Sequence, residues 1–133
     1  MTMTTAKSVL DLLTLAIADE LGEKAEVAIE FTGKKMELPI KKIMVATGIR
    51  NLNLYYEQDS EGNKTELRKL TVEALICAPK TEKGTSIADT VDGILTAVMT
   101  SDSLSLIKFY TGKASYSTNL GAILQPVYIT VGF

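Results

Sequence analysis

Few side chains in this sequence could do catalysis or bind a metal. The chain has no histidine, which removes the commonest general base, the commonest transition-metal ligand and the usual activator of a serine or cysteine nucleophile. The single cysteine, Cys77, lies in an apolar run. Burial among apolar side chains raises a thiol pKa and leaves the group inert. We therefore interpret Cys77 as a core residue.

Two carboxylates, Asp89 and Asp92, lie three residues apart near the start of an expected helix. A catalytic pair would need a cleft and perturbed pKa values, whereas carboxylates near a helix N-terminus are favourable to the helix dipole. The preceding run 84–86 could offer backbone N–H groups to an anion, but it lacks the spacing of a phosphate-binding loop. We interpret both features as structural, and the sequence predicts no metal or cofactor.

Lysines form a small cluster at Lys34, Lys35, Lys41 and Lys42. They could contact phosphate or an acidic neighbouring subunit, or they could keep a solvated strand edge from aggregating. The whole chain has 14 basic and 16 acidic residues, a net charge of −2, and a dedicated nucleic-acid-binding domain would be clearly basic. A membrane span would need an apolar run of about 20 residues, which this chain lacks.

The first element expected to position these residues is a helix from Thr5 to Leu21. Thr4 or Thr5 is a suitable N-cap and Gly22 a suitable stop. Leu12 and Leu15 widen the apolar stripe beyond one face. They predict either packing on two sides within the domain or a contact with another subunit.

The strands follow from alternating apolar residues and turn signals. The residues from Glu26 to Phe31 predict a strand that pairs with Met36–Leu38, and Ile40–Ala46 is a second strand or an irregular segment. A strand at Leu52–Tyr56 enters the polar run Glu57–Asn63, which we expect to be an exposed hairpin loop, and Lys64–Ala78 is the returning arm.

The second half predicts a helix over Ser86–Met99, with Ser86 and Asp89 as a capping pair. Strands are expected at Leu106–Tyr110 and from Val127 to the last residue, with Pro126 at the start of the latter, while 116–120 is ambiguous. The prediction is a single α+β domain over residues 1–133. It has a mixed or antiparallel sheet, an N-terminal helix and a second helix packed on that sheet, and a protruding β-hairpin.

This order of elements and the chain length resemble the tail-terminator (tail-completion) proteins of bacteriophages and phage-tail-like particles. The resemblance extends over most of the chain: the first helix, the protruding loop around 59–63, the strand 67–78, the second helix and the final strand. The family has no diagnostic short motif, and the segment 36–48 is longer and more apolar than its pattern.

The resemblance implies a non-catalytic structural role. Members form a ring, usually of six subunits, that caps the tail tube, stops polymerisation and presents a surface to the head connector. The implied partners are copies of the chain, the tail tube, and sheath or head-connector proteins, with DNA at most passing through the ring lumen. The implied location is a virion or tail-like particle assembled in the bacterial cytoplasm. The implied subunit or tube interface uses sheet edges and the loop: Lys34, Lys35, Lys41, Lys42, Arg50, Asp59, Glu61, Asn63, Lys64 and Arg68.

Two other functions remain open from the sequence. One is a different tail component, such as a tube or baseplate subunit. The other is a ligand-binding or enzymatic α+β domain that uses carboxylates such as Asp89 and Asp92.

Overall fold

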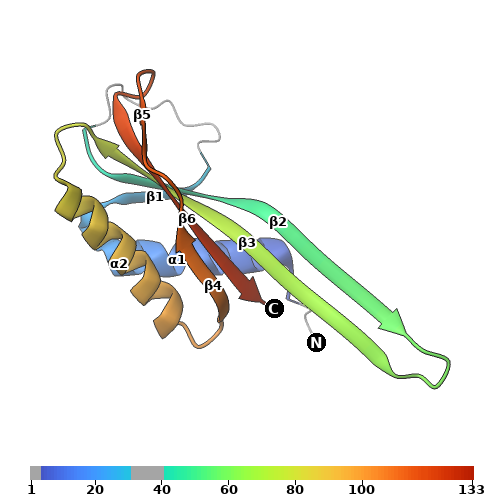
Figure 1. Cartoon of the computed structure of the whole chain (residues 1–133). Coiled ribbons are helices and arrows are strands. Elements are labelled where there is room, and N and C mark those ends of the chain that lie inside the picture. Colours follow the sequence, from blue (N-terminus) through green and yellow to red (C-terminus); the bar gives the residue numbers. More distant parts are fainter. Residues whose placement is uncertain (1–3, 31–40) are drawn as a thin grey trace.

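The computed structural model describes residues 4–30 and 41–133 (Figure 1). The elements are α1 (Ala6–Leu21), the 3-10 turn η1 (Gly22–Lys24), β1 (Glu26–Ile29), β2 (Met44–Gln58), β3 (Lys64–Pro79), α2 (Gly84–Thr100), β4 (Ser105–Thr111), β5 (Ser115–Ser117) and β6 (Ala122–Gly132). The predicted α+β fold with an N-terminal helix is confirmed. The expected strand Met36–Leu38 lies outside the described residues.

The strands form one mixed sheet in the order β1-β2-β3-β6-β4, and β5 also pairs with β6. β1 runs parallel to β2, and the other pairs are antiparallel. Both helices cover the same face of this sheet (Figure 1). None of the helices in the described chain is long and apolar enough to cross a membrane.

The core lies between the two helices and the covered face of the sheet. It contains alternate residues of β3 and β6, together with apolar residues of α1 and α2: Leu70, Val72, Ala74, Ile76, Val127, Ile129, Val131, Leu13, Ile17, Ile94 and Val98. On the opposite face a smaller cluster forms around Cys77 and Ala122. Cys77 is fully buried there, and burial raises its thiol pKa to about 11. Its interpretation as a core residue is confirmed.

Helix α1 begins and ends as predicted. The Thr5 hydroxyl accepts a hydrogen bond from the Ser8 N–H at 3.1 Å, and the Ser8 hydroxyl accepts one from the Thr5 N–H at 2.9 Å, which closes a capping box. Gly22 ends the helix with φ at 56°, a conformation that favours glycine. Inside the core, the Thr14 hydroxyl donates to the Leu10 carbonyl and lies 2.7 Å from the Thr47 hydroxyl, which attaches α1 to β2.

Helix α2 begins earlier than predicted. Its N-cap is Lys83, which makes no side-chain capping bond, so the predicted Ser86–Asp89 cap is wrong. Further along, α2 packs closely on the end of α1 at Gly93. A Cβ atom at Gly93 would lie 2.7 Å from Leu21 Cδ2, so a larger residue would require the Leu21 side chain to move.

Two strands are longer than predicted. The segment expected as a separate strand at 52–56 is the outer half of β2, which continues through Gly48 and a bulge at Arg50. β6 starts at Ala122 and contains Pro126. Proline fits because its missing N–H faces the break between β4 and β5. There the Gly112 N–H donates to the Pro126 carbonyl at 3.0 Å, and Gln125 Nε2 donates to the Gly112 and Pro126 carbonyls.

Candidate subunit interface

The outer halves of β2 and β3 form a hairpin that projects from the body of the molecule (Figure 1). In the described chain, β2 beyond Thr47 pairs only with β3, and the pairing of β3 with β6 ends at Lys69. A two-stranded ribbon with open edges is marginally stable by itself and offers unpaired backbone groups to another chain. The predicted protruding hairpin is therefore present, and it leaves strand edges available.

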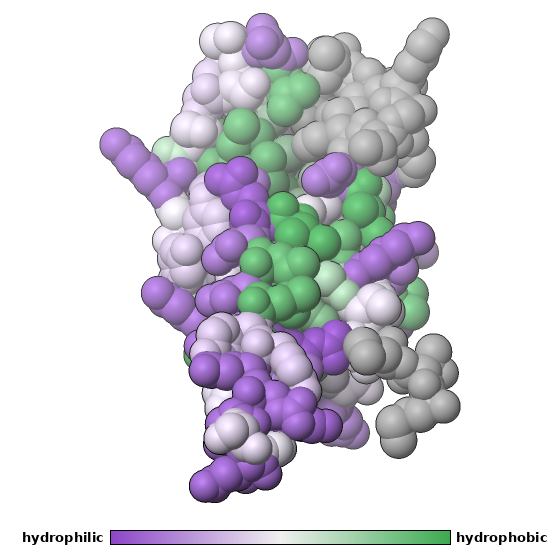
Figure 2. All heavy atoms as spheres, turned by 90° about the vertical axis from the view of Figure 1, so that its right-hand side faces the viewer, coloured by the Kyte–Doolittle hydropathy of each residue, from purple (hydrophilic) through white to green (hydrophobic). Residues whose placement is uncertain are grey.

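Apolar side chains of the hairpin face solvent. Leu54 is 58% exposed and Tyr56 60%, and Ile49, Leu52 and Tyr55 are also exposed. The register places Leu52 and Leu54 on the face of the sheet that carries the core residue Leu70, but beyond its helix cover. Figure 2 looks onto this end of the molecule and shows a hydrophobic area bordered by hydrophilic side chains. A monomer gains nothing from such exposure, so these residues are candidates for a contact with another protein.

The hairpin loop is ordered by Asp59. Its carboxylate accepts hydrogen bonds from the Asn63 N–H at 2.8 Å and the Glu61 N–H at 2.9 Å, and these bonds lower its pKa. The Gly62 N–H donates to the Asp59 carbonyl, and Gly62 takes φ at 86°, where glycine is favoured. This loop therefore presents its charged side chains from a fixed backbone.

The tip of the hairpin is acidic. We define the acidic tip as Glu57, Asp59, Glu61 and Glu66, all exposed, and Lys64 is the only basic residue between positions 57 and 66. The hydroxyl of Tyr55 donates to the Glu57 carboxylate, which raises the Tyr55 pKa. The predicted interface residues Asp59, Glu61, Asn63 and Lys64 all lie in this part of the hairpin.

Two predicted interface arginines are held by contacts within the chain. The Arg50 guanidinium lies 3.2 Å from the Glu73 carboxylate on the uncovered face of the sheet. Arg68 is half-buried, lies 4.3 Å above the Phe133 ring and donates to the Thr4 carbonyl. The Phe133 N–H in turn donates to the Arg68 carbonyl at 3.1 Å. Arg68 therefore joins the root of the hairpin to both ends of the described chain.

Two lysines of the predicted cluster, Lys41 and Lys42, lie at the end of the sheet opposite the tip. Lys34 and Lys35 are outside the described residues, whereas Lys41 and Lys42 are exposed just before β2. Because Met44 pairs with Cys77, the segment that follows β3 lies beside them, and it carries Lys80 and Lys83. Sequence analysis missed these two. Only the antiparallel pairing, not the spacing along the chain, brings the four lysines to one end.

Two further surfaces are available for contacts. In the part of the chain that the structure describes, β4 pairs only with β6, and Ile107 at its bulge is 49% exposed. On α1, Leu15 is 60% exposed and Leu12 37%. Two-sided packing within the domain does not occur at these leucines, so the subunit-contact alternative remains for them.

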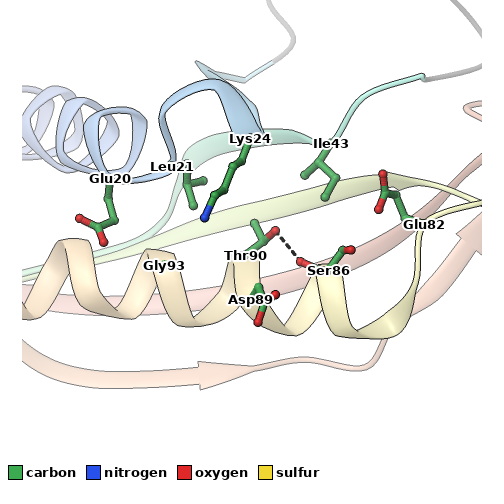
Figure 3. Close-up of a pocket in the computed structure, with 9 residues that line it drawn as sticks. All are labelled: Glu20, Leu21, Lys24, Ile43, Glu82, Ser86, Asp89, Thr90 and Gly93. Atoms are coloured by element: carbon green, nitrogen blue, oxygen red, sulfur yellow. Dashed lines mark hydrogen bonds between the residues drawn. The ribbon is translucent and has the colours of Figure 1, made fainter.

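The acidic residues considered for catalysis do not converge. Figure 3 shows a pocket of about 330 Å³ between the end of α1 and the start of α2, lined by Glu20, Glu82, Asp89 and Lys24 among others. Asp92 is not among the lining residues, and both aspartates are exposed. Among residues 4–30 and 41–133, no group of His, Cys, Asp or Glu could hold a metal ion.

No protein-family model matches this chain, and no curated protein matches its sequence. The case for a function therefore depends on the geometry. The described surface combines open strand edges, exposed apolar side chains on a projecting hairpin and an ordered charged loop. Such a surface can bind other protein chains by strand addition and by apolar contact.

Proposed function

We propose that this chain is a structural protein that forms a ring, caps the tail tube of a phage or phage-tail-like particle, ends tube growth and presents a surface to head-joining proteins. The observation that carries the proposal is the projecting hairpin, whose edges are open and whose Leu52, Leu54 and Tyr56 are exposed. Edges of this kind are blocked in most monomeric proteins, because they otherwise pair with other chains.

Two features support a ring in particular. In the sheet order β1-β2-β3-β6-β4, the hairpin extends from β2 and β3, toward the β1 end of that order. The second open edge, β4, is at the opposite end. Contacts between different surfaces of identical subunits generate closed rings when the rotation between neighbours closes. The tail tube as partner comes from the resemblance in element order, which is an argument by fold-level analogy.

The test uses tubes grown from the purified tube subunit of the tail-like particle to which the chain is assigned, and electron microscopy measures their lengths. The chain should bind tube ends as a ring and shorten the tubes in proportion to its concentration. Leu54→Ser should weaken this capping, because it removes an exposed apolar contact of the hairpin. Met99→Ser is the matched control, because Met99 is 67% exposed on α2, away from the hairpin.

Tubes that grow to the same lengths with and without the chain, and that carry no ring at their ends, would reject the proposal. If the purified chain itself polymerises into long tubes, it is a tube subunit instead.

A further inference from the structure

The two ends of the β2–β3 pair carry opposite charge. The acidic tip has four carboxylates against Lys64, and one of them, Glu66, also lies 3.9 Å from the Arg68 guanidinium. We define the basic end as the exposed lysines Lys41, Lys42, Lys80 and Lys83. Glu82 is the carboxylate within 41–43 and 79–83, and Glu20 and Asp89 line the neighbouring pocket together with Glu82, Ile43 and Lys24. The chain as a whole is nearly neutral, with a net charge of −2, so this separation is a local arrangement.

The sheet register keeps these charges far apart within one molecule. The pairing runs from Gln58–Lys64 at the tip to Met44–Cys77 near the basic end. At about 3.3 Å per residue, the two ends are roughly 45 Å apart. The acidic tip therefore cannot reach the basic end of its own chain, whereas it can reach that of a second copy.

Apolar surface accompanies the charge at both ends. Leu52, Leu54 and Tyr56 are exposed behind the acidic tip. Near the basic end, Met44, Leu75 and Leu124 are only half-buried around Cys77, on the face that the helices leave open. Each end thus offers an apolar area with charges at its border, the usual composition of a protein–protein contact.

One residue of the basic end, Lys83, is of a type that is unfavourable at its position, the start of α2. Lys83 is the N-cap of α2, where a cation opposes the helix dipole and where Ser, Thr, Asp or Asn would bond the exposed N–H groups. Its side chain makes no capping bond. Residues that break local preferences tend to lie at functional positions.

We infer that the acidic tip of one copy docks on the basic end of a second copy. This inference rests on the proposed self-association and names the surfaces that meet. The two surfaces differ, so the contact is head-to-tail, and it closes into a ring or continues as a filament according to the rotation between neighbours.

Charge reversal tests the contact. The tip variant carries Glu57→Lys, Glu61→Lys and Glu66→Lys, and it keeps Asp59 because that residue orders the loop. The basic-end variant carries Lys41→Glu, Lys42→Glu and Lys80→Glu, and it keeps the helix cap. Glu23→Lys, Asp92→Lys and Asp102→Lys form the control with the same charge change as the tip variant, since these three residues are exposed on η1, on α2 and in the turn after α2, outside both ends and away from Leu12 and Leu15. Circular dichroism verifies that each variant is folded.

Sedimentation velocity measures self-association. We expect each reversal variant to associate at least about tenfold more weakly than the natural chain, because like charges then meet. Raising the salt concentration from about 50 to 500 mM should weaken the association of the natural chain by a similar factor. Mixing the two variants should restore association. Combining all six reversals in one chain should also restore it. The control should associate like the natural chain.

Several results would overturn the docking. One is a control whose association is weakened as much as that of the reversal variants. Another is a mixture of the two variants that stays dissociated, and a third is a natural chain that is monomeric under all conditions measured. Association that none of these changes affects would also overturn it, while the ring proposal would stand, because tube capping is measured separately.

Discussion

The inner and outer halves of β2 and β3 belong to the same two strands but have opposite surroundings. In the inner half of β3, Leu70, Val72, Ala74 and Ile76 are fully buried under the helices. In the outer half, every residue of β2 from Ile49 to Gln58 is exposed. One register connects both halves, apart from the bulge at Arg50.

The apolar pattern continues where the cover stops. Leu52, Leu54 and Tyr56 keep the alternation of a strand with one buried face, although all three side chains are exposed. In the body, the same pattern is explained by α1 and α2. The comparison shows that an apolar strand pattern is buried in the body and exposed in the hairpin of the described chain, and this difference is the physical basis of the proposed assembly.

The largest expected effect is a difference in stability between the two halves. Ile76→Ala should lower the free energy of unfolding by about 2–5 kcal/mol, because it opens a cavity at a fully buried side chain. Leu54→Ala should change it by less than about 0.5 kcal/mol in the isolated chain, since Leu54 is already exposed. Urea unfolding measures both. Similar losses of unfolding free energy would mean that Leu54 packs in the core of the monomer and that the inner and outer halves of the strands do not differ in burial.

High pH should act on the body through Cys77. Burial raises its thiol pKa from 9.0 to about 11, so the folded state favours the neutral thiol. The stability that this provides is complete below pH 9 and is lost as the pH rises to 11. The loss reaches about 2–3 kcal/mol at most, because one pKa unit corresponds to about 1.4 kcal/mol.

Urea unfolding between pH 8 and about 11 measures this loss, with Cys77→Ala as the control, because lysines and tyrosines titrate in both chains over this range. The control should lose less stability over that range. Equal losses in both proteins would show that the thiol is accessible and that the small cluster around it is not a closed core.

Sequence analysis succeeded where the signal was local and failed where strand pairing supplied it. In the body, the helical period and the caps located α1 to within one residue, and the polar run after Tyr56 located the hairpin loop. The continuous β2 was missed because Gly48 and Arg50 interrupt its apolar pattern, and the bulge that accommodates them depends on pairing with β3. Pro126 inside β6 was missed because the groups that compensate for it come from Gly112 and Gln125.

The candidate interface was only partly predictable for a related reason. The loop residues are contiguous, so the sequence located the hairpin loop and its Asp59 and Glu61, whereas Glu57 and Glu66 were not assigned to the interface. The basic end joins lysines from two segments that strand pairing brings together, and Lys80 and Lys83 carried no signal of their own. Arg50 and Arg68 were assigned to the interface that the resemblance implies, but the fold gives each an internal contact, with Glu73 and Phe133 respectively.

The smallest expected effect separates stability from assembly at one residue. Lys83→Asp should raise the free energy of unfolding by about 0.5–1 kcal/mol, because an aspartate N-cap bonds the first turn of α2 and suits its dipole. The same change should weaken self-association, because it reverses a charge of the basic end.

Lys80→Asp is the control: it makes the same charge change outside the cap, so it should weaken association without the gain in stability. Thermal unfolding and sedimentation of the three proteins measure the two quantities. A Lys83→Asp protein that is more stable and associates as well as the natural chain would show that Lys83 takes no part in self-association. The unfavourable N-cap would then be no evidence that the acidic tip docks on the basic end.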